Sequence, residues 1–139
     1  MSVWVNVTAS PDSAFSGIVG TQSDPSDVSY KITYGDGGGS PEIRFNRLKN
    51  GVANGLITHT VTLPINGSYQ HIVATYDGTN SRLYLNGTLV AGPTAFSGSG
   101  TGSTTTRSFI LRDVQDVAQD FNGKVDEVGI WDRNLSTAE

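Results

Sequence analysis

Residues 71–91 constrain the fold more than any other stretch, because they hold three short alternating runs separated by two turn sequences. The turns are Asp77-Gly-Thr-Asn80 and Asn86-Gly87. Asn-Gly suits a two-residue type I′ hairpin, since both central positions need a positive φ that these residues tolerate. The stretch therefore predicts an antiparallel meander. Its buried face carries alternate side chains, namely Ile72, Ala74, Tyr76, Leu83 and Leu85.

The rest of the chain has the same character, with short alternating runs and no sustained helical period. Its 139 residues suffice for one domain with a real core. Only 36% of residues are hydrophobic and 17 are glycine, so polar turns are frequent. This composition favours an all-β sandwich or barrel. Further strands are expected at 3–7, 15–20, 28–34, 42–48, 56–63, 108–111 and 125–131, with loops at 92–107 and 112–120.

Charge and cysteine content exclude several classes of function. The net charge of −4 comes without a basic stripe, which argues against nucleic acid as a partner. No apolar run reaches the roughly 20 residues that a membrane span needs, so membrane insertion is not expected. With no cysteine there is neither a disulfide nor a thiolate metal site.

Two motifs carry a resemblance to a known family. The run HIVATYDGTNSRLYLNGTLVA begins at His71, and FNGKVDEVGIWDRNLSTAE begins at Phe121. They resemble the central and closing signatures of laminin-G-like, or pentraxin-like, jelly-roll domains of the concanavalin A-like lectin and glucanase superfamily. The resemblance implies a two-sheet antiparallel jelly-roll sandwich. It also implies one domain over residues 1–139, excised from or part of a longer protein, with Val128 and Ile130 in its core.

Catalysis is the first hypothesis, because this superfamily contains retaining glucanases, which need two converging carboxylates roughly 5–5.5 Å apart. Glutamates occur only at 42, 127 and 139. Asp126 and Glu127 are neighbours on an expected strand, where alternation sends their side chains to opposite faces. We expect His71 to be a strand residue with a satisfied hydrogen bond and not a catalytic base. We therefore expect a non-catalytic domain.

Calcium binding is the second hypothesis. Calcium takes several oxygen ligands from flexible loops, and residues 113–120 are rich in carboxylates and amides. The pentraxin resemblance implies ligands at matching positions, although Val114 stands where pentraxins carry a glutamate. The alternative is that these are solvated acids in ordinary turns. The candidate metal ligands are Asp24, Asp27, Gln115, Asp116 and Asp120.

Sugar recognition is the third hypothesis, and it requires an exposed aromatic side chain beside hydrogen-bonding groups. The available aromatics are Tyr30, Tyr34, Phe96 and Trp131. Alternation assigns most of them to the core. Phe96 alone is flanked by expected loop residues, so it is the candidate ligand-binding residue.

These observations together favour a recognition module that binds carbohydrate or a surface protein, with calcium assistance left open. The resemblance implies an extracellular, cell-surface or virion-surface location. The alternative is a structural or decoration domain, a subunit of a virus particle, filament or cell-surface assembly that binds no small ligand. The resemblance supplies only an analogy for either function, because a fold does not fix what a domain binds.

Overall fold

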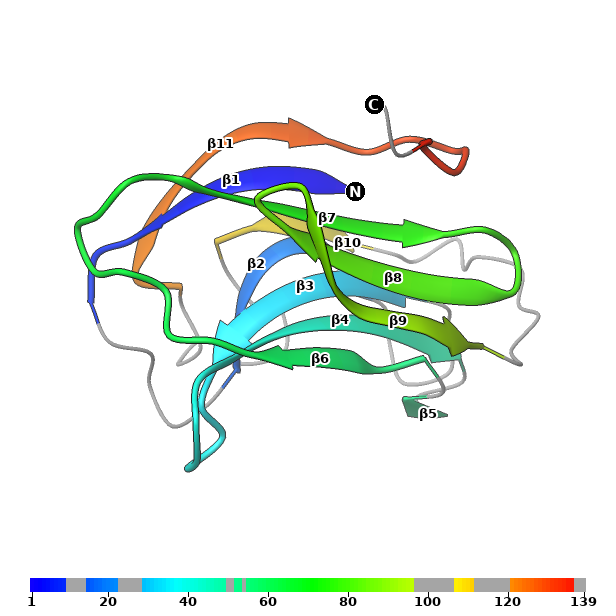
Figure 1. Cartoon of the computed structure of the whole chain (residues 1–139), viewed down its shortest axis with the longest axis horizontal. Helices are drawn as coiled ribbons and strands as arrows, with labels where there is room; N and C mark the ends of the chain where they lie inside the picture. The colour runs from blue at the N-terminus through cyan, green and yellow to red at the C-terminus, as the bar shows by residue number, and fades with distance from the viewer. Residues whose placement is uncertain are drawn as a thin grey trace.

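A computed structural model describes residues 1–9, 15–22, 29–49, 52–53, 55–96, 107–111 and 121–136. These residues form strands and turns, with no helix among them (Figure 1). The strands are β1 Ser2–Val7, β2 Phe15–Gln22, β3 Ser29–Gly35, β4 Glu42–Lys49, β5 Val52–Ala53, β6 Ile57–Thr60, β7 Gln70–Tyr76, β8 Asn80–Leu85, β9 Thr88–Ala95, β10 Arg107–Ile110 and β11 Gly123–Gly129.

The strands pair into two antiparallel sheets. The first sheet has the order β11-β1-β7-β8-β9, and the second has the order β10-β2-β3-β4-β5, with β6 also paired to β4. Figure 1 shows the two sheets face to face. The all-β sandwich expected from the sequence is confirmed.

The core lies between the sheets and is mostly aliphatic. Alternate residues of β1, β3, β4 and β7 enter it, because successive side chains of a strand point to opposite faces. Its buried members are Val3, Val5, Val7, Ile18, Val19, Ile32, Tyr34, Ile43, Phe45, Ile57, Leu63, Ile72, Ala74, Leu83 and Phe121.

The central meander is formed by β7, β8 and β9, as expected. Asn86 and Gly87 have φ of 50° and 79°, which confirms the type I′ geometry of their turn. The Asn86 side chain also accepts a hydrogen bond from the His71 backbone N–H at 2.9 Å. The turn is therefore attached to the start of β7.

Several boundaries and core assignments differ from the expectations. β11 ends at Gly129, so Ile130 and Trp131 lie beyond the strand and are 49% and 44% exposed; assigning Ile130 to the core was wrong. β9 continues to Ala95, where a loop from residue 92 was expected. The strand expected over residues 56–63 is confined to Ile57–Thr60. The expected core side chains Tyr76, Leu85 and Val128 are only partly buried.

A β-bulge interrupts the alternation of β11. Ser2 pairs with Gly129 and Trp4 pairs with Asp126, so one strand has an extra residue between these pairs. Glu127 lies in this bulge with a φ of 47°, and the side chains of Asp126 and Glu127 are both exposed. Strict alternation therefore does not apply to Asp126 and Glu127. The expectation that their side chains point to opposite faces of the strand cannot be based on it.

Candidate binding site

The interior face of the second sheet changes from aliphatic to polar at one end. On β4, Ile43 and Phe45 are buried in the core, and Arg47 is the next residue on the same face. On the antiparallel neighbour β3, Tyr30 precedes Ile32 on the same face and pairs directly with Arg47. Paired residues of antiparallel strands have neighbouring side chains on one face. A tyrosine and an arginine thus end the row of core side chains.

The facing sheet contributes Tyr76, which follows Ile72 and Ala74 along β7. The guanidinium carbon of Arg47 lies 3.5 Å from the centroid of the Tyr76 ring and 4.6 Å from that of Phe96. A guanidinium over an aromatic face is attracted by the negative potential of the ring. Arg47 therefore bridges the two sheets at this end of the sandwich.

The charge of Arg47 is incompletely satisfied by hydrogen bonds. Its NH1 atom is buried and has no hydrogen-bond partner within the part of the chain that the structure describes. A buried donor without a partner loses its interaction with water and gains none in return, which costs about 1–3 kcal/mol and more for a charged group. The unpaired donor therefore makes this position of Arg47 costly in free energy, and because the NH1 atom is buried it is not exposed to the cavity.

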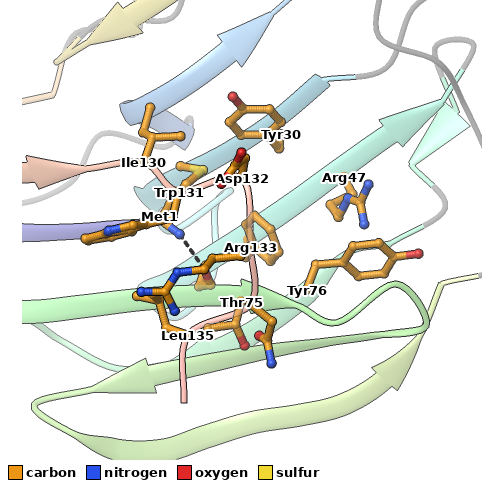
Figure 2. A pocket seen from close by; sticks show the side chains of 13 residues that line it. Met1, Tyr30, Arg47, Thr75, Tyr76, Ile130, Trp131, Asp132, Arg133 and Leu135 are labelled. Atoms are coloured by element: carbon orange, nitrogen blue, oxygen red, sulfur yellow. Dashed lines mark hydrogen bonds between the residues drawn. The ribbon is translucent and has the colours of Figure 1, made fainter. Parts of the chain in front are cut away.

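A cavity of about 460 Å³ opens beside these side chains. The segment 130–135, which follows β11, forms its other wall (Figure 2). In the view of Figure 2, Asp132 lies towards Tyr30, while Arg47 lies over Tyr76 on the other side. The described lining residues are Met1, Tyr30, Phe45, Arg47, Ala74, Thr75, Tyr76, Ile130, Trp131, Asp132, Arg133, Asn134 and Leu135.

Gly129 sets the position of Trp131 at the rim of the cavity. The indole of Trp131 packs so closely on Gly129 that a Cβ at this position would lie within 3 Å of the ring. Any larger residue at position 129 must therefore displace the indole. The bulged strand β11 and the exposed Trp131 are linked by this contact.

The lining suits a polar ligand that also has an apolar face. Small-molecule sites are concave, typically of 300–1,000 Å³, with aromatic walls and a few polar groups that fix orientation. Here Tyr30, Tyr76 and Trp131 supply aromatic surface, and Arg47 supplies a donor. Asp132 supplies a carboxylate acceptor.

Phe96, the aromatic singled out from the sequence, is only 5% exposed. Its ring packs edge-on against Tyr76, with centroids 5.8 Å apart, and beneath the guanidinium of Arg47. The expectation of an exposed aromatic at position 96 is wrong, because β9 extends further than expected and carries Phe96 to the interior. A direct contact between Phe96 and a ligand stays a prediction.

All five candidate calcium ligands, Asp24, Asp27, Gln115, Asp116 and Asp120, lie outside the described residues. These residues belong to two loops, one after Gln22 and one after Leu111. Gln22 pairs with Arg107 at the start of β10, whereas Leu111 follows the end of β10, so the described residues next to the two loops lie at opposite ends of that strand. Within the described ranges, no group of three or more histidine, cysteine, aspartate or glutamate residues has a metal-binding arrangement. Calcium therefore stays a prediction.

Sequence reasoning missed Arg47 and Asp132. The alternation that identified Ile43 and Phe45 as core also places Arg47 on their face, and a charged residue in that register was a usable signal. Asp132 had no comparable signal, because its place in the cavity depends on the path of residues 130–135. Tyr30 and Trp131 were named as aromatics but assigned mainly to the core.

A second polar cluster lies on the outer face of the first sheet. Trp4 and His71 are paired across β1 and β7, and their rings stack with centroids 4.6 Å apart. The Ser2 hydroxyl and His71 Nε2 share a hydrogen bond of 2.6 Å. Burial lowers the pKa of His71, and the nearby Glu127 carboxylate partly opposes this shift. The expected hydrogen-bonded role of His71 in a strand agrees with this arrangement.

Comparison with known proteins gives one family. The profile described as the concanavalin A-like lectin/glucanases superfamily matches residues 1–139. No curated protein matches the chain. None of the described segments forms a helix long and apolar enough to cross a membrane.

Proposed function

The chain belongs to the concanavalin A-like lectin/glucanase superfamily, and we propose that it is a non-catalytic module that binds carbohydrate in the cavity beside Arg47. Domains of this superfamily include both sugar-binding lectins and glycosidases, so family membership alone leaves the choice open. The cavity beside Arg47 supports the binding alternative.

One observation carries the proposal: the aliphatic core ends in a cavity whose walls combine aromatic rings with hydrogen-bonding groups. A pyranose ring has apolar C–H faces and a rim of hydroxyl groups. Its faces match aromatic side chains such as Tyr30 and Trp131, and its hydroxyl groups match a carboxylate acceptor such as Asp132. The cavity of about 460 Å³ is within the range of small-molecule sites.

We also propose that the domain does not catalyse a reaction. Arg44 forms an ion pair with Glu42 at 3.4 Å, and neither residue lines the cavity. Asp132 is the one carboxylate among the described lining residues, whereas glycoside hydrolysis uses two. A binding role requires only the groups that are present.

The biological setting is also proposed by analogy. Laminin-G-like domains are typically extracellular, and such a location suits recognition of glycans on a cell or virion surface. Calcium assistance, through the five loop residues that the sequence singles out, is an additional element of this proposal. A surface protein carrying the same glycan would be an equivalent partner.

A glycan array tests the proposal with three proteins: wild type, Tyr30→Ala and Tyr69→Ala. Tyr69 is 38% exposed and lies outside the cavity, so its variant is a matched control for loss of a tyrosine ring. We expect wild type and Tyr69→Ala to bind the same saccharides and Tyr30→Ala to lose them. Equal binding by all three proteins would show that the saccharide binds outside this cavity. Absence of binding by wild type would favour the alternative of a structural domain that binds no small ligand.

A further inference from the structure

The chain contains five Asn-Gly pairs, and the structure describes both residues of three of them. The asparagine of such a pair is susceptible to deamidation, because glycine has no side chain to hinder attack by its own backbone nitrogen. The described pairs begin at Asn66, Asn86 and Asn122, whereas the asparagines at positions 50 and 54 lie outside the described residues. The surroundings of the three described pairs differ in ways that bear on this reaction.

Deamidation of an Asn-Gly pair is an intramolecular substitution. The glycine backbone nitrogen bonds to the side-chain carbonyl carbon of the asparagine, and the proton that this nitrogen loses leaves with the amide group as ammonia. One water molecule then opens the cyclic imide at either carbonyl, which gives aspartate or isoaspartate. In isoaspartate the main chain passes through the side chain and gains one methylene group. The reaction therefore needs an amide that can rotate and a glycine nitrogen that can be approached.

The amide of Asn86 is held at both ends. Its Oδ1 accepts a hydrogen bond from the His71 backbone N–H at 2.9 Å, and its Nδ2 donates to Gln70 Oε1 at 2.7 Å. Both bonds must break before the side chain can turn towards the nitrogen of Gly87. The attachment of this turn to β7 therefore protects Asn86 from deamidation.

The pair at Asn122 is protected through its glycine. The Gly123 N–H donates a hydrogen bond to the Phe121 carbonyl at 3.1 Å. A Cβ at position 123 would lie within 3 Å of both the Phe121 ring and the Asn6 carbonyl oxygen. The attacking nitrogen is therefore paired, and its surroundings are crowded.

Asn66 has neither form of protection. It is exposed, and within the part of the chain that the structure describes no hydrogen bond engages its side-chain amide or the N–H of Gly67. Its φ of 50° lies in the left-handed region, which asparagine tolerates better than most residues. We propose that Asn66 is a modification site, at which the folded protein deamidates spontaneously. This inference goes beyond carbohydrate binding and does not depend on it.

The product changes how the segment before β7 is attached to β1. The Asn66 N–H donates to the Val7 carbonyl at 2.6 Å, and the Asn6 side-chain amide donates to the Gly67 carbonyl at 2.5 Å. These two bonds flank the site, so an added methylene group changes the spacing between them. Isoaspartate at position 66 should therefore weaken this attachment and lower the stability of the domain.

The test is peptide mapping by mass spectrometry of wild-type protein kept at mildly alkaline pH, either folded in buffer or unfolded in urea. In the folded protein we expect Asn66 to deamidate roughly 10-fold or more faster than Asn86, since two hydrogen bonds hold the Asn86 amide. It should also react faster than Asn122. In urea the rates at Asn66 and Asn86 should become similar, because the dipeptide is the same. A rate at Asn66 that does not exceed both others in the folded protein would overturn the inference.

Two variants test the physical causes. Gln70→Ala removes the acceptor of the Asn86 amide, so it should speed deamidation at Asn86; an unchanged rate there would contradict protection by this bond. Asn66→Gly removes the reactive amide and accommodates the positive φ. Storage should lower the melting temperature of wild type but not that of Asn66→Gly, each compared with its own fresh sample. An equal loss in both proteins would contradict the structural effect assigned to position 66.

Discussion

Arg47 of β4 and Tyr76 of β7 belong to different sheets, yet the guanidinium carbon of one lies 3.5 Å from the ring centroid of the other. The contact closes the interior of the sandwich at the end where the cavity opens. It stabilises the fold and also fixes the position of the charge.

Two substitutions of Tyr76 distinguish the contribution of its ring to stability from that of its hydroxyl group. Tyr76→Leu removes the aromatic face under Arg47, and we expect a loss of about 0.5–2 kcal/mol in the free energy of unfolding. Tyr76→Phe keeps the ring and loses the exposed hydrogen bond from the hydroxyl to the Gly78 carbonyl, so it should cost less. Urea denaturation of both variants checks the order; equal losses would show that the stacking contact contributes nothing.

Tyr34 tests a polar contact within the core. Its hydroxyl oxygen accepts a hydrogen bond from the Leu63 backbone N–H at 3.0 Å, and both residues are 2% exposed. Tyr34→Phe leaves that buried N–H without a partner, and we expect a destabilisation of about 1–3 kcal/mol. Tyr69→Phe, at a tyrosine that is 38% exposed, is the control and should change stability little. A neutral Tyr34→Phe substitution would mean that Leu63 finds another acceptor.

The lowered pKa of His71 predicts how the stability of the folded protein varies with pH. Burial lowers its pKa in the folded protein below the unfolded value of about 6.5. Between the two values the unfolded chain binds more protons, so stability falls as pH decreases from neutrality through that window. His71→Gln should reduce this pH dependence, as measured by urea denaturation at pH 7 and pH 5. His59→Gln, at the chain's other histidine, should retain it; loss of the dependence in that variant instead would reject the assignment.

Calcium is tested by thermal unfolding, because a ligand that binds only the folded state raises its melting temperature. If the loop around Asp116 binds calcium, the ion should raise the melting temperature of wild type but not of Asp116→Ala, and a chelator should reverse the effect. Asp36→Ala, at an exposed turn outside the candidate set, is the control. Coincident melting curves with calcium and with chelator would remove calcium from the proposal.

The all-β sandwich could be predicted from the sequence, because alternation and turn chemistry are local signals. Ile72, Ala74 and Leu83 are buried, and Asn86 and Gly87 form the expected turn. Alternation failed where it is interrupted by non-local geometry. The bulge at Glu127 is one example, and the end of β11 before Ile130 is another.

The candidate site was harder to predict, because it forms where the two sheets and a C-terminal segment meet. Arg47, Tyr76 and Asp132 are far apart in sequence, and only the pairing of strands and the path of residues 130–135 bring them to one cavity. The burial of Phe96, which lies just past the end of β9, could not be predicted for the same reason. Its burial depends on the register of β9 beside β8, which no local pattern specified.

The most direct test of carbohydrate binding uses the indole N–H resonances of the two tryptophans, Trp4 and Trp131. Trp131 lines the cavity, whereas Trp4 stacks on His71 on the outer face of the first sheet. During titration of ¹⁵N-labelled protein with the saccharide selected on the array, we predict that the Trp131 resonance shifts and the Trp4 resonance does not. A shift of Trp4 alone, or of neither tryptophan at saturation, would contradict binding in this cavity.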